Sequence, residues 1–242
     1  MMPPSGITLT DVSLTLSGKP VLGGISLHLT EPRIGIVGRN GSGKTTLLRV
    51  MAGLVAPTTG TVRLGAIDPA LDRKALLTRI GILFQNPDQM ILFPTVAEEL
   101  AFGLLQLGQS KAMAEAAVTA LLAAEGRSHW AAAPVSTLSQ GQRHYLCLLS
   151  VLLMGPQTIL LDEPLAGLDL PTQIRLARRL AGLAQQVITI THDPEAVAGA
   201  DRVIWLEDGA VRLDGPAAPV LTAFRAAMDQ AGASDADTDL AG

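Results

Sequence analysis

Hydrophobic and polar residues alternate along the start of the chain in the pattern typical of β-strands. Two such runs, Ile7–Leu16 and Val21–Leu29, flank a short turn containing Gly and Pro and predict an antiparallel strand pair. A third run, Ile34–Val37, is continuously apolar, as in a parallel strand buried on both faces. Thr46–Met51 then predicts a helix, with Gly53 as the residue that ends it.

The middle of the chain changes from strand patterns to helical ones. Thr61–Leu64 and Ile80–Phe84 predict two more strands. From Pro94 to Met154 the pattern is mostly helical, and Glu98–Leu107 and Lys111–Glu125 are rich in good helix formers.

Strands return in the last third of the chain. Thr158–Leu161, Val187–Ile190 and Arg202–Leu206 are short apolar runs. Gln173–Ala184 predicts a helix between two of them, as a parallel βαβ unit requires. Asp208-Gly209 is a hairpin signal that follows the last of these strands.

These patterns predict an α/β domain with an antiparallel β subdomain and an inserted helical subdomain. We expect one domain over residues 1–228, with a core of 1–85 and 157–228 and a helical insert of 86–156. Residues 229–242 are rich in Ala, Asp and Gly without periodicity, and we expect them to be disordered.

Composition narrows the class of protein. Hydrophobic residues make up 48% of the chain, but no stretch has the apolar length of a membrane helix. Residues 1–5 have neither a basic start nor an apolar core, and we expect no secretory signal there. The net charge of −4 argues against a nucleic-acid partner. The single cysteine, Cys147, lies in an apolar helical run and is expected to be a buried hydrophobe.

The strongest chemical signal is the segment Gly38–Thr45, which has the spacing Gly, four residues, Gly-Lys-Thr between a strand and a helix. Its glycines let backbone N–H groups point at phosphates, and the helix N-terminus adds a positive field. Lys44 is expected to reach the β- and γ-phosphates of ATP, and the Thr45 hydroxyl to ligate Mg²⁺. The expected nucleotide contacts here are Gly38, Arg39, Asn40, Gly41, Ser42, Gly43, Lys44, Thr45 and Thr46.

A second signal stands at the end of the strand Thr158–Leu161, where Asp162 and Glu163 follow. Ligands of open α/β sheets bind at the carboxyl ends of the strands. We therefore expect Asp162 to hold Mg²⁺, directly or through water, and Glu163 to act as the general base on the attacking water.

A third signal is Leu138–Gln142, which precedes the helix Arg143–Met154. Ser139 and Gly141 at a helix N-terminus can form a second anion site. Alone this signal is weak, because Ser-x-Gly turns are common.

Together these motifs resemble the ATP-binding cassette ATPases, and the resemblance covers residues 7–215. Leu138–Gln142 is similar to the signature motif of that family, Gln85 to its glutamine loop, Ala166–Asp169 to its D-loop, and His192 to its switch histidine. The resemblance implies a RecA-like P-loop NTPase core that hydrolyses ATP. The roles that it implies are catalysis by Lys44, Gln85, Glu163 and His192, Mg²⁺ binding by Thr45, Gln85 and Asp162, and nucleotide contact by Leu16, Ser139, Gly141, Gln142 and Asp169.

The resemblance also implies a head-to-tail dimer. ATP would lie between the phosphate loop of one subunit and Ser139–Gly141 of the other, so that hydrolysis removes the contact joining the halves. A homodimer is the simplest form.

One stretch is more specific. Phe84–Gly103 and Leu138–His144 are similar to the energy-coupling-factor (ECF) branch of importers, most of all to the ATPases of biotin uptake. This implies a position on the cytoplasmic face of the membrane, with a transmembrane coupling protein and a substrate-binding membrane protein as partners. Cobalt and nickel uptake ATPases are the nearest alternative, followed by a soluble ATP-binding cassette protein; the short insert, the single cassette and the acidic charge disfavour the latter.

Two positions depart from the family pattern. The family usually has an aromatic residue for adenine stacking where this chain has Leu16, and position 140 of the signature motif is Gln rather than Gly. Adenine would then be held by aliphatic contact.

Overall fold

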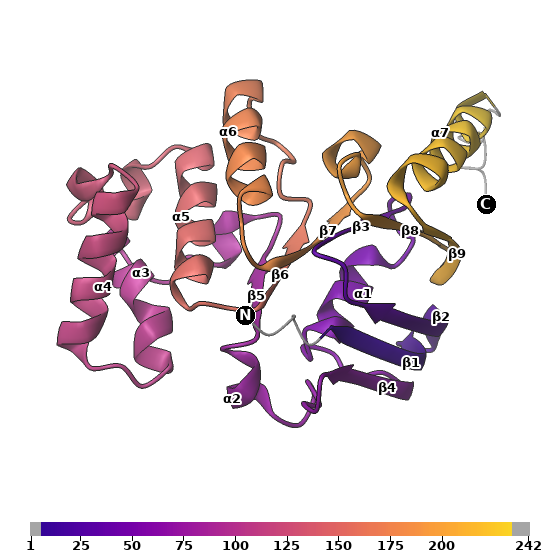
Figure 1. Cartoon of the computed structure of the whole chain (residues 1–242), viewed down its shortest axis with the longest axis horizontal. Helices are drawn as coiled ribbons and strands as arrows, with labels where there is room; N and C mark the ends of the chain where they lie inside the picture. The colour runs from indigo at the N-terminus through magenta and orange to yellow at the C-terminus, as the bar shows by residue number, and fades with distance from the viewer. Residues whose placement is uncertain (1–5, 234–242) are drawn as a thin grey trace.

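The computed structural model describes residues 6–233 and contains two β-sheets with helices around them (Figure 1). The strands are β1 (Ile7–Leu16), β2 (Lys19–Leu29), β3 (Arg33–Val37), β4 (Thr59–Leu64), β5 (Ile80–Leu83), β6 (Thr158–Asp162), β7 (Gln186–Thr191), β8 (Arg202–Glu207) and β9 (Ala210–Gly215). The α-helices are α1 (Lys44–Met51), α2 (Arg73–Leu76), α3 (Val96–Gln106), α4 (Lys111–Ala124), α5 (Gln140–Leu153), α6 (Leu170–Ala181) and α7 (Ala217–Ala233).

The smaller sheet is antiparallel, with the order β2-β1-β4. Ile7 lies opposite Leu29 of β2 on one side and Leu64 of β4 on the other, and all three side chains are buried. The alternation in the sequence is thus the alternation between the buried and exposed faces of this sheet, and the predicted antiparallel pair is confirmed.

The larger sheet has the order β5-β6-β7-β3-β8-β9. Its strands are parallel except β9, which pairs antiparallel with β8 at the edge. The register places Val37 beside Thr191, and Asp162 beside Ile190. The carboxyl ends of β3, β6 and β7 therefore meet at one edge of the sheet.

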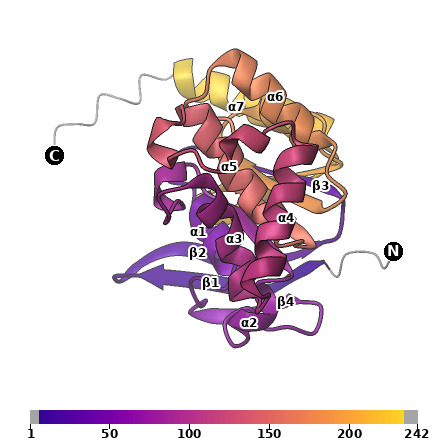
Figure 2. The ribbon, with the colours of Figure 1, turned by 90° about the vertical axis from the view of Figure 1, so that its left-hand side faces the viewer.

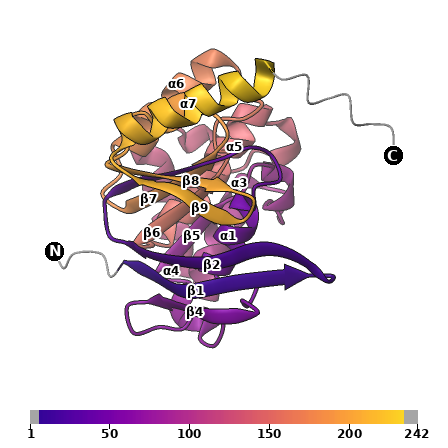
Figure 3. The same cartoon turned by 90° about the vertical axis from the view of Figure 1, so that its right-hand side faces the viewer.

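Helices cover both faces of the larger sheet. Helix α1 lies between the two sheets (Figure 3), where Leu47 and Leu48 are fully buried among residues of both. On the opposite face, α5 and α6 pack over β5, β6 and β7, and α7 packs over β3 and β8. Both faces are apolar, which explains the continuous hydrophobic runs of the central strands.

Helices α3, α4 and α5 form a separate helical layer (Figure 2) with its own small core, which includes Val96, Leu100 and Val118. Helix α5 belongs to this core through Leu146 and to the core of the larger sheet through Cys147 and Leu148. It is therefore the element that joins the helical layer to the sheet.

Helix α7 was not predicted, and it corrects the expectation of disorder from residue 229. The helix runs from Ala217 to Ala233, so residues 229–233 are helical. Its buried face starts with Val220 and Leu221, includes Phe224 at 5.4 Å from Trp205 between ring centroids, and continues to Met228. The last turn extends a helix that is already anchored. Residues 234–242 lie outside the described residues.

Helix α6 begins earlier than its hydrophobic pattern indicated, because the Asp169 carboxylate accepts a hydrogen bond from the backbone N–H of Thr172 and caps the helix at 2.9 Å. Among the described residues, the helices are all too short or too polar to cross a lipid bilayer.

Candidate functional site

The carboxyl edge of the larger sheet carries most of the predicted phosphate and metal residues around one cavity of about 440 Å³, whereas Gly38, Arg39, Ser42 and Asp162 do not line it. The phosphate loop follows β3, Asp162 ends β6 with Glu163 directly after it, and His192 follows β7. The residues that line the cavity are Val21, Asn40, Gly41, Gly43, Lys44, Thr45, Thr46, Gln85, Glu163 and His192.

The phosphate loop needs its glycines for two different reasons. Gly41 and Gly43 have φ of 83° and 96°, a left-handed region that disfavours other residues. A Cβ at Gly38 would lie 2.3 Å from the carbonyl oxygen of Leu206, so no side chain fits there. Glycine therefore permits both the turns of the loop and its close approach to β8.

The turn between β8 and β9 is hydrogen-bonded to the phosphate loop, a contact that the sequence did not indicate. The turn Asp208-Gly209 between β8 and β9 has positive φ at both residues, and the N–H of Gly209 donates to the carbonyl of Ser42 at 3.1 Å. The carbonyl of Gly209 accepts from Gly23 of β2 at 3.0 Å. The hairpin thus connects the phosphate loop to the antiparallel sheet.

Lys44 begins helix α1 and is buried, although it carries a charge. Its Nζ donates to the carbonyls of Gly38 at 2.7 Å and Arg39 at 2.9 Å, which places the ammonium within the curve of the loop. Burial lowers the pKa of Lys44, and the carboxylates of Glu163 and Asp162 act in the opposite direction. A phosphate beside Nζ would supply the negative charge that this buried cation lacks.

Thr45 and Asp162 form the candidate magnesium site. The Thr45 hydroxyl donates to Asp162 Oδ1 at 3.1 Å, so two hard oxygen ligands stand side by side, with Gln85 on the wall of the same cavity. Burial raises the pKa of Asp162, and the hydrogen bond from Thr45 partly opposes this. The donor set fits Mg²⁺, which commonly takes one or two protein oxygens and completes its shell with phosphate and water.

Glu163 is held in a strained and heavily bonded position. Its φ of 48° lies in the left-handed region, which is uncommon for a residue with a side chain. Its carboxylate accepts hydrogen bonds from the Thr191 hydroxyl at 3.0 Å and the His192 backbone N–H at 2.9 Å, and lies 2.8 Å from His192 Nδ1. The end of β7 therefore fixes where this candidate base points.

The signature residues lie apart from the phosphate loop. Ser139 caps α5: its hydroxyl accepts from the Gln142 N–H at 3.3 Å, and the Gln142 side-chain oxygen accepts from the Ser139 N–H at 2.7 Å. The side-chain oxygen of Gln142 is thus already bonded within the cap. Ser139, Gly141 and Gln142 line a different cavity, of about 360 Å³, which shares no lining residue with the first.

Gly141 and Asp169 bring α5 and α6 together. A Cβ at Gly141 would lie 2.7 Å from Cγ2 of Thr172 in α6, so the glycine permits the close approach of the two helices. Asp169 is engaged as the cap of α6, and its hydrogen bonds from Thr172 lower its pKa.

Leu16 ends β1 with its side chain 43% exposed, and it is not part of the cavity wall. Val21 of the neighbouring strand lines the cavity instead. No motif marks Val21 in the sequence. Val21 reaches the cavity wall because its carbonyl contacts Gly209 and because β2 lies close to Gly43, and the sequence pattern indicated neither contact.

Comparisons with known proteins agree on one family. Residues 22–166 match the ABC transporter family. The chain is 50% identical to the biotin transport ATP-binding protein BioM of Rhodobacter capsulatus over 222 residues, which cover 92% of this chain and 95% of that protein. It is 39% identical to BioM of Rhizobium etli over 219 residues, or 90% and 97% of the two chains.

Solved structures of similar fold include CbiO1 from Clostridium perfringens, part of the ABC transporter complex CbiONQ. It has a TM-score of 0.79 and 27% identity and covers 93% of this chain and 94% of that one. The ATP-binding cassette MJ0796, solved as a dimer in a post-hydrolysis state with ADP and phosphate, has a TM-score of 0.74 and 25% identity, covering 87% and 98%.

Proposed function

Because the chain belongs to the ABC transporter family and is an ATPase of that family, we propose that it powers an ECF-type importer for biotin. The observation that carries this proposal is the near full-length match to two biotin transport ATP-binding proteins. The cavity at the sheet edge supports it, because phosphate-binding, metal-binding and basic groups line one space.

In the proposed reaction, Lys44 and the backbone of the phosphate loop bind the phosphates of ATP. Thr45 and Asp162 hold Mg²⁺, with Gln85 nearby, and the ion offsets charge that develops on the transferred phosphoryl group. Glu163 accepts a proton from the attacking water, and His192 orients Glu163.

A second copy of the chain completes the site in this proposal. Ser139 lies outside the cavity that contains Lys44, so one chain alone does not bring the two anion sites together. A head-to-tail dimer would do so, with two ATP molecules at the interface. The resemblance to a cassette solved as a dimer with ADP and phosphate supports this arrangement.

The membrane partner is proposed to dock where β5 leads into the helical layer. A cavity of about 390 Å³ lies there, lined by Asp88, Ile91, Phe93, Pro94, Pro134, Val135, Ser136 and Arg143. The Asp88 carboxylate is 62% exposed and lies 3.2 Å from Arg143 Nε, so one face of it can still meet a basic residue of a cytoplasmic helix.

Two other acidic side chains near this cavity already accept hydrogen bonds from groups of the same chain. Glu99 is buried and accepts from the backbone N–H groups of Leu92 and Phe93 at 2.8 and 3.0 Å. Glu98 bonds to Thr95 at the start of α3. Asp88 is therefore the acid that we assign to the partner, on the cytoplasmic face of the membrane.

Uptake measurements in cells that carry this chain and its membrane partners test the substrate. Biotin uptake should be lost on Glu163→Gln, whereas uptake of cobalt or nickel should not depend on the chain. ATP-dependent uptake of a metal ion but not of biotin would contradict the proposed substrate. Asp88→Arg should lower biotin uptake while basal ATP hydrolysis continues; uptake equal to that with unchanged Asp88 would contradict the docking site.

A further inference from the structure

Four arginines line the cavity that also contains Ser139, Gly141 and Gln142. Arg127 follows α4, and Arg175, Arg178 and Arg179 lie along α6; all four line the same space of about 360 Å³ as Ser139. The whole chain has a net charge of −4, so this local concentration of positive charge is opposite in sign to the net charge.

The acids nearby do not neutralise this group. Glu125 lies 2.9 Å from Arg179 Nη2 and also accepts from the Tyr145 hydroxyl. Asp169 is close enough to Arg175 for that arginine to contribute to the lowering of its pKa, after the larger effect of the Thr172 hydrogen bonds. Four arginines thus face two carboxylates.

Two of the arginines also have buried donors without acceptors. Arg127 Nε and Arg179 Nε are shielded from solvent and lack a hydrogen-bond partner among the described residues. An anion in the cavity would bond instead to the guanidinium nitrogens that make no hydrogen bond among the described residues, Nη2 of Arg127 and Nη1 of Arg179. Arg178, in addition, has a side chain with no partner within the described part of the chain.

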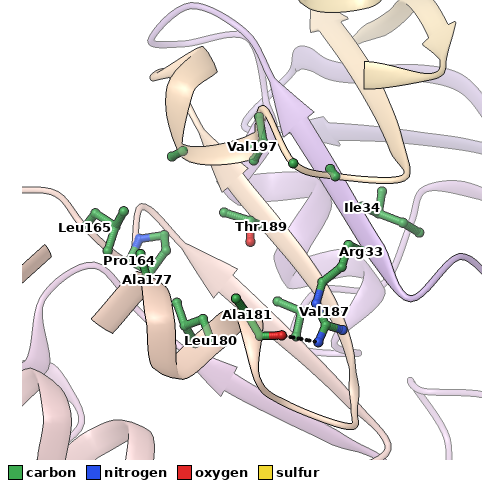
Figure 4. A pocket seen from close by; sticks show the side chains of 13 residues that line it. Arg33, Ile34, Pro164, Leu165, Ala177, Leu180, Ala181, Val187, Thr189 and Val197 are labelled. Carbon is green, nitrogen blue, oxygen red and sulfur yellow. Dashed lines mark hydrogen bonds between the residues drawn. The ribbon is translucent and has the colours of Figure 1, made fainter. Parts of the chain in front are cut away.

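Another cavity of the molecule shows what a purely structural arginine looks like (Figure 4). Arg33 lines a mainly apolar pocket between β3, β7 and α6, and its guanidinium donates to the carbonyls of Pro32 at 2.9 Å, Ala181 at 3.2 Å and Gln185 at 2.7 Å, and to that of Leu183. Both terminal nitrogens of that guanidinium therefore have two backbone acceptors each. The arginines beside the signature loop differ in this respect.

The shape of the arginine cavity also restricts its ligand. The Arg127 guanidinium lies 5.1 Å from the ring centre of Trp130 and 4.5 Å from that of Tyr145, so it covers the ring faces on which a nucleobase would stack. The cavity therefore presents charge rather than an aromatic platform.

We propose that Arg127, Arg175, Arg178 and Arg179 form a further anion site, distinct from the phosphate loop and from the contact of Ser139 and Gly141 with ATP, and that it binds a compact ligand with two or more phosphate groups. The site does not depend on the phosphate loop or on the transported substrate. Because Ser139 and Gln142 share its walls, its ligand would lie beside the start of α5.

Pyrophosphate is the probe, and Lys44→Ala is used to weaken competing binding at the phosphate loop. Equilibrium dialysis of the full chain should find one bound pyrophosphate per Lys44→Ala chain, with affinity that falls as salt rises. Trp130 reports binding directly when the other tryptophan is removed by Trp205→Phe, since Trp130 contacts Arg127. Absence of binding at millimolar pyrophosphate would overturn the proposal.

Arg178→Gln is the variant of choice, because the Arg178 side chain makes no hydrogen bond or ion pair with the described residues. In the Lys44→Ala background it should weaken pyrophosphate binding about three- to tenfold, the loss expected for one charge-assisted hydrogen bond on an exposed side chain. Arg178→Lys should recover part of the affinity. Arg73→Gln, an exposed arginine on α2, is the matched control and should change nothing.

Equal affinities for Arg178→Gln and Arg73→Gln would overturn the assignment. Comparing the affinities of ADP and pyrophosphate shows whether the site recognises phosphate groups alone or a whole nucleotide. ADP should bind the Lys44→Ala chain about as well as pyrophosphate does. ADP binding more than tenfold tighter would mean that the site recognises the base, which contradicts a compact phosphate ligand.

Discussion

Glu163 and His192 are joined at two points: Glu163 Oε1 accepts from the His192 backbone N–H at 2.9 Å and lies 2.8 Å from its Nδ1. The first contact belongs to the backbone at the end of β7 and survives substitution of the histidine. The second is lost with the ring. The carboxylate of Glu163, the proposed base, is thus positioned mainly by the sheet, and the imidazole adds one further contact.

The role of Glu163 leads to the first prediction. Glu163→Gln should leave ATP and Mg²⁺ binding nearly unchanged and lower turnover about 10²–10⁴-fold, because an amide does not accept the proton of water. Steady-state hydrolysis and nucleotide titration measure the two effects. Lys44→Ala is the comparison, since it should weaken binding itself. Turnover within a few-fold of the unchanged protein would show that Glu163 is not the base.

The separation of Ser139 from the phosphate loop leads to the second prediction. With ATP, the Glu163→Gln chain should shift from monomer to dimer in light scattering, and ADP should not produce this shift. Ser139→Arg should prevent it, because bulk and positive charge at the cap of α5 would obstruct the partner's nucleotide. A dimer that forms equally with and without ATP would contradict the sandwich arrangement.

The third prediction concerns adenine. Leu16 is 43% exposed at the end of β1, so Leu16→Tyr has room for a ring. A stacked ring contributes roughly 1–3 kcal/mol in other nucleic-acid-binding proteins, and a leucine recovers part of this by apolar burial. ATP should therefore bind several-fold more tightly to Leu16→Tyr, with the maximal hydrolysis rate unchanged.

A fluorescent ATP analogue measures this affinity. Leu213→Tyr on β9 is a suitable control, because Leu213 is similarly exposed at 39% and lies outside the cavity that contains Lys44. If Leu16→Tyr and Leu213→Tyr bind ATP alike, Leu16 does not contact the base.

The fourth prediction uses the raised pKa of Asp162. Burial, the largest cause, raises this pKa, so the folded chain binds a proton more readily than the unfolded chain does. Without Mg²⁺, stability should therefore fall as pH rises from the ordinary carboxyl range through the raised pKa. Asp162→Asn should raise the melting temperature of the metal-free protein at neutral pH and weaken Mg²⁺-dependent ATP binding. A lower melting temperature would contradict the assigned cost of this charge.

The fifth prediction concerns Cys147, which is 1% exposed between α5 and the larger sheet. Burial raises the pKa of its thiol to about 12, and the carboxylates of Glu99 and Asp88 add to this. The thiol should resist alkylation in the folded protein and react only when α5 separates from the sheet. Mass spectrometry after timed exposure to iodoacetamide measures the rate. Rapid labelling under native conditions would show that α5 is not held as described.

The sequence predicted the elements whose pattern is determined locally. The run Ile34–Val37, the phosphate loop and the acids after Thr158–Leu161 carry their own signals, because a buried parallel strand and a phosphate-binding turn each demand particular residues in order. The structure brings Lys44, Glu163 and His192 to one cavity, as their positions after neighbouring strands indicated.

Features that depend on distant contacts were not predictable in this way. The support of Ser42 by Gly209 joins residues from opposite ends of the chain. Helix α7 is Ala-rich and weakly patterned, and it is stabilised by packing of Phe224 on Trp205 rather than by a local signal. Val21 lines the cavity because the two sheets are stacked, which no short motif encodes.

The contact of Gly141 with Thr172 has a mechanical consequence. Because Gly141 has no side chain, the start of α5 lies close against the Thr172 side chain in the first turn of α6, and the two helix starts are packed without a gap. A displacement that arises at one of these helix starts passes to the other as a rigid push rather than being absorbed between them. Gly141 thereby acts as a stiff coupling between the start of α5 and the start of α6.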